Sequence, residues 1–265
     1  TEPLMKKLYL ILITFFSRHL TPARIFVLSF AVFIAVGTLL LWMPFSSDKF
    51  DLHFVDALFL ATSSVCITGL SPVDIGTELT LAGQLIIMGL FQAGGLGIIT
   101  FSIILFALMG RGVSFKGREL AQSTFLHTPR RDFYSILLRV VRYSLIIEAV
   151  GTLLLFCRFI IDFPAGRAFY NALFHAISAF NNAGFSLFST SLASYQSDIA
   201  VNIIVIGLIV LGGIGFIVIH EVLDRWRGRQ KKLSIHTRIV LFTTIFLILT
   251  GAASFYFTEI NNVLK

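Results

Sequence analysis

The sequence has few charged residues and only two cysteines. Asp, Glu, Lys and Arg make up 13% of the 265 residues, whereas hydrophobic residues make up 56% and the mean hydropathy is +0.88. Soluble domains carry about 25% charged residues. The composition therefore excludes an ordinary soluble protein and predicts an integral membrane protein. Cys66 and Cys157 have no metal-ligand spacing and form no disulfide framework.

Lys and Arg are unevenly distributed along the chain. They gather before Ile25, between Arg111 and Arg142, and between Arg225 and Arg238, whereas the remaining connections are mostly acidic. This asymmetry is the positive-inside pattern, which predicts a cytoplasmic N-terminus and cytoplasmic basic segments. The net charge of +7 therefore indicates membrane orientation rather than nucleic-acid binding. Cytoplasmic basic segments without a transit peptide predict a bacterial cell (inner) membrane.

A short apolar stretch that ends in a glycine-bearing loop occurs twice. Phe54–Ser71 and Phe169–Ser186 align without a gap, and eight identities share one constant offset. The shared residues are Phe54, Ala57, Leu58, Phe59, Ala61, Ser63, Gly69 and Ser71, repeated as Phe169, Ala172, Leu173, Phe174, Ala176, Ser178, Gly184 and Ser186. The preceding segments repeat as well, because VGTLLL stands at both Val36–Leu41 and Val150–Leu155. Internal repetition of this kind indicates a duplicated membrane unit.

The duplication predicts an all-α membrane protein whose repeated unit is an outer helix, a re-entrant pore helix with a filter loop, and an inner helix. The expected segments are an N-terminal cytoplasmic or interfacial helix (1–23), a first pore repeat (24–110), a basic cytoplasmic linker (111–132), a second pore repeat (133–221), a second basic linker (222–237) and the first helix of a third repeat (238–265). The expected helices are outer Ile25–Met43 and Val140–Phe156, short Leu52–Val65 and Ala168–Phe180, and inner Leu79–Met109 and Ile199–His220. The short helices cannot cross a hydrocarbon core of about 30 Å, which needs roughly 20 residues.

Each short helix leads into a loop whose backbone is suited to binding a cation. At membrane depth an irregular loop must line protein or water, and a helix C-terminus carries roughly half a negative charge, which favours a cation. Backbone carbonyls can there replace the hydration shell of an ion. The candidate filter residues are Cys66, Ile67, Thr68 and Gly69 in the first loop and Asn181, Asn182, Ala183 and Gly184 in the second. Gly69 and Gly184 are expected to adopt positive φ, which glycine allows without a steric penalty.

The glycines of the inner helices are explained by close helix packing. Gly89, Gly94, Gly95 and Gly97 recur as Gly207, Gly212, Gly213 and Gly215. Their GxxxG-like spacing suits helix contact in a membrane. The GGLG run lacks the preceding strand of a dinucleotide-binding fold, so that interpretation fails.

Two motifs carry a resemblance to a known family. VCITGL after the first short helix and NNAGFSL after the second resemble the Trk/Ktr/HKT superfamily of potassium transporters, with the closest pattern in the bacterial KtrB/TrkH-type membrane subunit. The resemblance covers nearly the whole chain and implies four units around one pseudo-fourfold ion pore. In that family, glycine at the first two filter positions, here Gly69 and Gly184, goes with potassium preference. The potassium-binding carbonyls would be those of Ile67, Thr68, Asn182 and Ala183.

The sequence departs from the family pattern in its length. It lacks a third filter loop, a third inner helix and a fourth unit, which predicts truncation to about two and a half of four repeats in preference to a pore shared by several chains. The resemblance further implies potassium uptake by a pore-forming subunit, a homodimer and a cytosolic RCK-type nucleotide-binding ring. No covalent cofactor is expected, and nucleotide would act only through that ring. The basic segments 111–131 and 225–238 suit the ring and anionic lipid equally well.

Four polar residues within the expected helices are given structural roles. Glu148 is expected to be protonated or bonded to backbone near a pore helix, since its counterpart in the first unit is Ile34. Asp56 and Asn171 are expected to cap the pore helices. His175 is expected to be a packed histidine rather than a metal ligand, because no second ligand lies at useful spacing.

Two other functional classes are alternatives to a transporter. A non-conducting scaffold or regulatory half, whose loops are packing relics, is the alternative to a transporter. An integral membrane enzyme has no Ser/His/Asp set, paired carboxylates or metal cluster to support it, so the chain is not expected to be an enzyme.

Overall fold

A computed structural model describes residues 22–47, 52–97, 133–229 and 232–259 of the chain. Within these ranges every regular element is a helix, apart from one isolated antiparallel bridge between Ser47 and Leu79. The predicted all-α class is confirmed. The expected N-terminal helix and the basic linker 111–132 lie outside the described residues.

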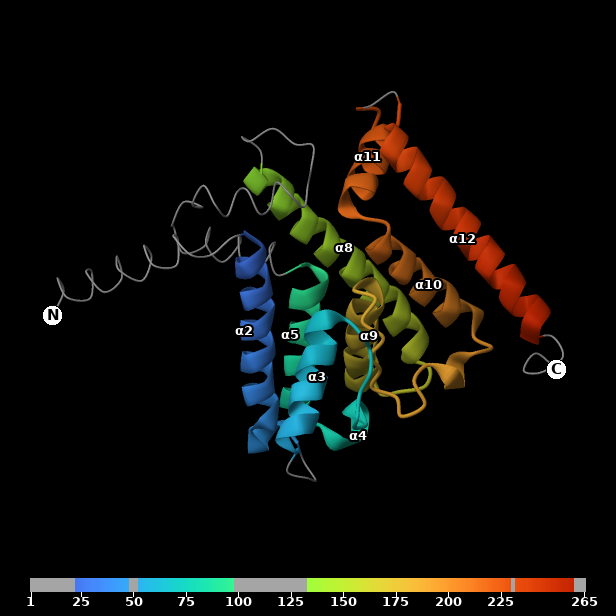
Figure 1. Cartoon of the computed structure of the whole chain (residues 1–265). Coiled ribbons are helices and arrows are strands. Elements are labelled where there is room, and N and C mark those ends of the chain that lie inside the picture. Colours follow the sequence, from blue (N-terminus) through green and yellow to red (C-terminus); the bar gives the residue numbers. More distant parts are fainter. Residues whose placement is uncertain (1–21, 48–51, 98–132, 230–231, 260–265) are drawn as a thin grey trace, which may run out of the picture.

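The first unit is a compact group of three helices (Figure 1). These are α2 (Pro22–Trp42), α3 (Phe54–Cys66) and α5 (Leu81–Gly95), with the single turn α4 (Ile75–Glu78) between the last two. Apolar residues at helical spacing bring the three together, because Leu41 of α2, Leu60 of α3 and Phe91 of α5 are fully buried in one cluster. The short helix α3 thus packs between two longer neighbours, as the predicted unit requires.

The second unit repeats this arrangement, and its first two helices are longer than those of the first unit. Here α8 (Phe133–Phe159) packs along the short helix α9 (Ala165–Phe180), and α10 (Ile199–Gly213) contacts both. Phe180 of α9 and Leu208 of α10 are buried in a second apolar cluster. The predicted helices are therefore present, although α8 and α9 begin earlier than expected.

An aromatic contact joins the two units. Phe91 of α5 meets Phe174 of α9 edge-on at a ring-centroid distance of 5.6 Å and stacks on Phe185 of the second loop at 5.9 Å. Phe91 and Phe174 are fully buried, and Phe185 is almost so. Aromatic pairs of this geometry add about 0.5–1.5 kcal/mol beyond burial, so the second loop is anchored on the inner helix of the first unit.

The prediction of continuous inner helices was wrong. After Gly213 the chain passes Gly215 at φ 90 and starts α11 (Phe216–Trp226), so that Ile199–Gly213 and Val218–Trp226 are bent by 107°. In the first unit α5 also stops, at Gly95, and the matching glycine, Gly97, has φ 77; the remainder of that predicted helix, 98–109, lies outside the described residues. A residue with positive φ cannot continue a right-handed helix, which explains both stops.

The last described helix, α12 (Ile235–Glu259), stands apart from the rest and meets the other helices mainly at α11 (Figure 1). Most of its side chains are exposed, as for Phe242 at 73%. Two described helices, Leu138–Phe159 and Ile235–Glu259, are long and apolar enough to cross a membrane, and the bent pair α10–α11 would add a third. Val27–Trp42 of α2 is a shorter apolar helix.

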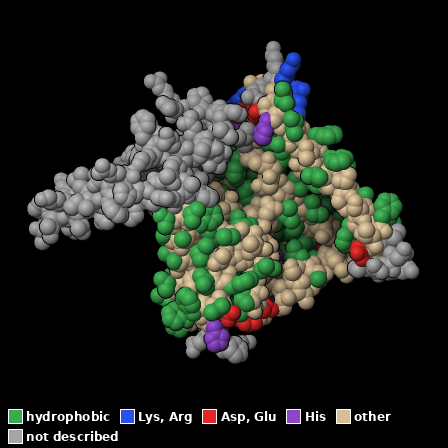
Figure 2. All heavy atoms as spheres, viewed as in Figure 1, with side chains coloured by type: hydrophobic (Ala, Val, Ile, Leu, Met, Phe, Trp, Pro, Cys, Tyr) green, Lys and Arg blue, Asp and Glu red, His purple; other side chains and the backbone are tan. Residues whose placement is uncertain are grey.

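Surface side chains agree with a membrane setting. In Figure 2 hydrophobic side chains spread over the visible face, while the visible basic side chains lie at the end where α11 meets α12. That end carries Arg225, Arg227 and Arg229. The predicted orientation, with basic segments in the cytoplasm, stays a prediction.

Candidate functional site

The two candidate filter loops lie against each other. An atom in the Cβ position of Gly69 would stand 2.7 Å from the carbonyl oxygen of Ala183 and 3.2 Å from the Cα of Gly184. The structure therefore brings together the two glycines that the sequence singled out, and neither loop has room for a side chain between them. The ends of α3 and α9 converge on this contact.

The two loops also have the same backbone conformation. Gly69 has φ 74 and Gly184 has φ 75, which confirms the expected positive values. Two positions earlier, Ile67 and Asn182 have φ 58 and 56. Each loop thus alternates a left-handed residue, an ordinary residue and a left-handed glycine at matching positions.

A Schellman-type helix end accounts for the first left-handed residue in each loop. The amide of Thr68 donates to the carbonyl of Ser63 at 2.9 Å, and the amide of Ala183 donates to that of Ser178 at 2.8 Å. Such bonds take up carbonyls that a helix C-terminus leaves without partners and place the intervening residue in the left-handed region.

The left-handed residues Ile67 and Asn182 were missed in the sequence. Asparagine tolerates this conformation, but for a β-branched residue it is a true outlier that costs about 1–2 kcal/mol. A strained backbone of this kind is typical of functional sites. The alignment of Ile67 with Asn182 was the only available signal, because asparagine alone suggests a left-handed residue.

The loop carbonyls form a set of free acceptors. Among the described residues, no hydrogen bond is donated to the carbonyls of Ile67, Thr68, Asn182 or Ala183. In an apolar medium, each carbonyl without a hydrogen-bond partner would cost several kcal/mol of free energy. Thr68 and Asn182 are exposed, whereas Ala183 is fully buried, so the four unbonded carbonyls are not equally open to solvent.

The inner-helix glycines hold the pore helices close, as predicted for part of the set. A Cβ on Gly94 of α5 would overlap the carbonyl oxygen of Val65, and one on Gly212 of α10 would overlap that of Phe180. Val65 and Phe180 are matching residues at the ends of α3 and α9. Each inner helix thus lies directly behind the start of its own loop. Gly89 has no described atom within 4 Å of such a Cβ, and neither has Gly207.

Glu148 is buried, with 4% of its surface exposed, at the point where α5, α8 and α9 meet. Gln92 Nε2 donates to its two carboxyl oxygens at 2.8 and 3.0 Å, and Asn181 Nδ2 lies 3.4 Å from Oε1. Its place near a short helix agrees with the expectation, but its partners are amide side chains rather than backbone, and the structural role stays a prediction.

The predicted caps did not form as expected. Asn171 is buried in α9 beyond the first turn and cannot cap a helix that begins at Ala165. Asp56 lies in the first turn of α3, behind the N-cap His53, where its charge still suits the helix dipole. The observed starts lie two residues after the expected Leu52 and three before the expected Ala168, so Asp56 falls in the first turn of α3 and Asn171 lies well inside α9.

His175 is a packed histidine, as expected. Its Nδ1 donates to the carbonyl of Asn171 at 2.7 Å, its Nε2 is hydrogen-bonded with Ser186 Oγ at 2.9 Å, and its ring stacks on Phe188. No group of three His, Cys, Asp or Glu side chains in the described ranges could hold a metal ion.

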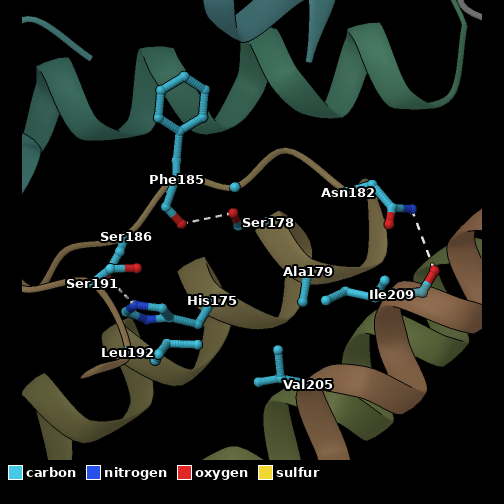
Figure 3. Close-up of a pocket in the computed structure, with 11 residues that line it drawn as sticks. His175, Ser178, Ala179, Asn182, Phe185, Ser186, Ser191, Leu192, Val205 and Ile209 are labelled. Carbon is cyan, nitrogen blue, oxygen red and sulfur yellow. Dashed lines mark hydrogen bonds between the residues drawn. The ribbon is translucent and has the colours of Figure 1, made fainter. Parts of the chain in front are cut away.

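A cavity of about 220 Å³ lies beside the second loop (Figure 3). The loop contributes Asn182, Gly184 and Phe185, while α10 contributes Val205 and Ile209. Asn182 Nδ2 donates to the carbonyl of Ile209 at 3.3 Å across one end of it. The cavity adjoins two candidate filter residues, Asn182 and Gly184, and none of its lining side chains is an acid, a lysine or an arginine.

Comparison with known proteins places the chain among cation transport proteins. Residues 16–264 match the TrkH family, described as a cation transport protein. The chain is 36% identical to the Ktr system potassium uptake protein B of Bacillus subtilis (strain 168) over 91% of this chain and 54% of that protein. It is 38% identical to the protein of the same name from Vibrio alginolyticus, over 90% of this chain and 52% of that protein.

A third relative is named for two ions. The potassium/sodium uptake protein NtpJ of Enterococcus hirae is 33% identical over 93% of this chain and 54% of that protein. The chain thus spans about half the length of the curated relatives it matches.

Proposed function

The chain belongs to the TrkH family of cation transport proteins, and we propose that it forms part of the potassium-conducting pore of a Ktr/Trk-type uptake system. The family is one of transporters, so the chain is not an enzyme. Potassium is the substrate proposed here because the relatives of B. subtilis and V. alginolyticus are named as potassium uptake proteins.

One observation carries the proposal. Two loops of different sequence share one backbone conformation, with positive φ at Ile67 and Gly69 and at Asn182 and Gly184, and they touch at the two glycines. The helix ends account for the left-handed Ile67 and Asn182, but the repeated positive φ at Gly69 and Gly184, two residues further on, needs another reason. A shared requirement on where the carbonyls point does supply one, because K⁺ filters bind the dehydrated ion through backbone carbonyls.

The ion would be held at the carbonyls of Ile67, Thr68, Asn182 and Ala183, with Cys66, Gly69, Asn181 and Gly184 completing the two filter segments. The C-termini of α3 and α9 add partial negative charge at the same place. Two segments alone do not surround an ion. The rest of a pseudo-fourfold filter is proposed to come from further units of the same kind.

The cavity beside the second loop supports this arrangement. In the first unit, the surface of α5 beside the first loop is covered by Phe174 and Phe185 of the second unit, which pack on Phe91. The residue that matches Phe91 in the second unit is Ile209, which lines the cavity. We propose that a third unit fills this space with a side chain equivalent to Phe185.

The remaining parts of the proposal concern the setting of the pore. The protein would lie in the bacterial inner membrane with a cytoplasmic N-terminus, in contact with lipid, as a homodimer. A cytosolic RCK-type ring would dock on the basic face and bring nucleotide control. The segment 222–237 would contribute to that face.

Serine substitutions at the filter glycines test the filter assignment. Gly69→Ser should lower the K⁺/Na⁺ uptake ratio about tenfold, because strain of about 1–2 kcal/mol adds to a clash with Ala183. Gly184→Ser should have the smaller effect, since its Cβ would meet only the Cα of Gly69, at 3.3 Å. Competing K⁺ and Na⁺ uptake by the full-length protein in an uptake-deficient bacterium measures both.

Gly166→Ser is the matched control, because Gly166 lies in the first turn of α9 with no described atom within 4 Å of its Cβ position. Selectivity that is unchanged in both filter variants would refute the filter assignment. A full-length protein that reaches the membrane but gives no K⁺-dependent growth would instead favour the non-conducting scaffold.

A further inference from the structure

Three side chains form a polar link between the two units, in which Glu148 and Asn181 are buried and Gln92 is half-buried. Gln92 comes from α5 of the first unit, whereas Glu148 and Asn181 come from α8 and the end of α9 in the second. Asn181 Nδ2 donates to Gln92 Oε1 at 2.6 Å, and Gln92 Nε2 donates in turn to both oxygens of Glu148. The amide of Gln92 is thus the bridge between the acid and the loop.

The link fixes the first residue of the second filter segment. Asn181 is 7% exposed, and its Nδ2 also lies 2.9 Å from the carbonyl of Ile177. Its Oδ1 lies so close to Gly95 of α5 that a Cβ atom on Gly95 would overlap it. The Asn181 side chain is therefore held on both sides, immediately before the left-handed Asn182.

Duplication does not explain this link. The counterparts of Asn181 and Glu148 in the first unit are Cys66 and Ile34, and the counterpart of Gln92 in the second unit is Val210. All three polar residues therefore occur at one junction between units and have apolar counterparts elsewhere. Burying the carboxyl of Glu148 and the amide of Asn181 is unfavourable unless they find hydrogen-bond partners, so the joint presence of the three residues points to a role at this junction.

We propose that Glu148 is a positioning residue for ion selectivity, which acts through Gln92 on Asn181 and so sets the geometry of the second filter segment. The inference rests on the proposed filter function. Glu148 itself does not touch the ion. It orients the Gln92 amide, whose oxygen then receives Asn181 in a single position, and removal of the acid would leave that amide free to turn.

Glu148→Leu removes the acceptor at similar volume and should lower the K⁺/Na⁺ uptake ratio of the full-length protein about tenfold, a typical effect of breaking a buried hydrogen bond. The apparent KM for K⁺ should rise with it. Ser144→Ala is the control, one turn earlier on α8: Ser144 is fully buried and donates only to the carbonyl of Val140. It should leave the ratio unchanged.

An exchange of the two groups provides a test of rescue. Gln92→Glu alone places two carboxyl groups together and should lower the ratio at least as much as Glu148→Leu. Gln92→Glu combined with Glu148→Gln restores one acid and one amide, and Asn181 can then donate to the acid directly. The double variant should recover the wild-type ratio to within about threefold.

The outcomes separate this inference from the filter assignment. If Gly184→Ser alters selectivity but Glu148→Leu changes only the amount of protein in the membrane, or if the exchange recovers nothing, the positioning role is wrong. If Gly69→Ser and Gly184→Ser both leave selectivity unchanged, the filter assignment itself fails. Should Glu148→Leu not accumulate, Asn181→Cys, which installs the residue of the first unit, tests the same link from the loop and should also lower the ratio.

Discussion

Alanine substitutions at four inner-helix glycines should divide into two opposite classes. At Gly94 and Gly212 the added methyl group would overlap the carbonyl oxygens of Val65 and Phe180, the final carbonyls before the candidate filter loops. Both neighbours are backbone, so no side chain can turn aside to make room. The pore helix and the inner helix would have to separate, and the loop start would move with them.

The magnitudes follow from the two environments. Adding a methyl group to a close-packed contact costs about 1–3 kcal/mol, and a backbone partner places Gly94→Ala and Gly212→Ala near the upper end. Alanine in place of glycine within a helix returns about 1 kcal/mol. At Gly89 and Gly207, where no described atom lies within 4 Å of the Cβ position, only that gain remains. The two classes should therefore differ by about 2–3 kcal/mol.

Denaturant titration of the purified full-length protein in detergent measures this difference in the free energy of unfolding. K⁺-limited growth measures the effect of each variant on uptake. Gly94→Ala and Gly212→Ala should unfold earlier and grow poorly, whereas Gly89→Ala and Gly207→Ala should match or exceed the wild type. Equal shifts of the same sign at Gly94 and Gly89 would refute the close approach of α5 to α3.

Two further predictions concern the helix ends. Thr80→Ala should lower the free energy of unfolding by about 1 kcal/mol, because Thr80 Oγ1 accepts from the amide of Gly83 and donates to the carbonyl of Phe45. Denaturant unfolding measures this loss. Thr62→Ala, on an exposed face of α3, is the nearly neutral control. Asp198 caps α10 and bonds to Arg158, and the amide of Val201 together with that arginine lowers the pKa of its carboxyl below the ordinary 3.8. A lowered pKa contributes stability that is present above about pH 4 and is lost as the pH falls through the folded value, so the advantage of the wild type over Asp198→Asn should shrink on acidification; an advantage that grows instead would contradict this assignment.

Sequence reasoning succeeded where one residue type determines the local geometry. Gly69 and Gly184 could be assigned positive φ because glycine adopts it freely and because the whole flanking helix was duplicated with them. It failed at Gly215, where an apolar run continues on both sides and gives no sign that the helix stops. The link between Gln92, Glu148 and Asn181 could not be predicted either, because its members lie 33 to 89 positions apart in the chain.

The unequal residues at Ile67 and Asn182 show what the duplication preserves. If side-chain preference set the loop conformation, isoleucine would leave the left-handed region, and the first loop would differ from the second. Instead φ is 58 at Ile67 and 56 at Asn182, although the isoleucine pays a strain of about 1–2 kcal/mol. The helix-end bonds from Thr68 and Ala183 impose the turn in both loops. The common property of the two units is therefore the backbone conformation of their loops, which is kept while the side chains differ, as Cys66 and Asn181 do.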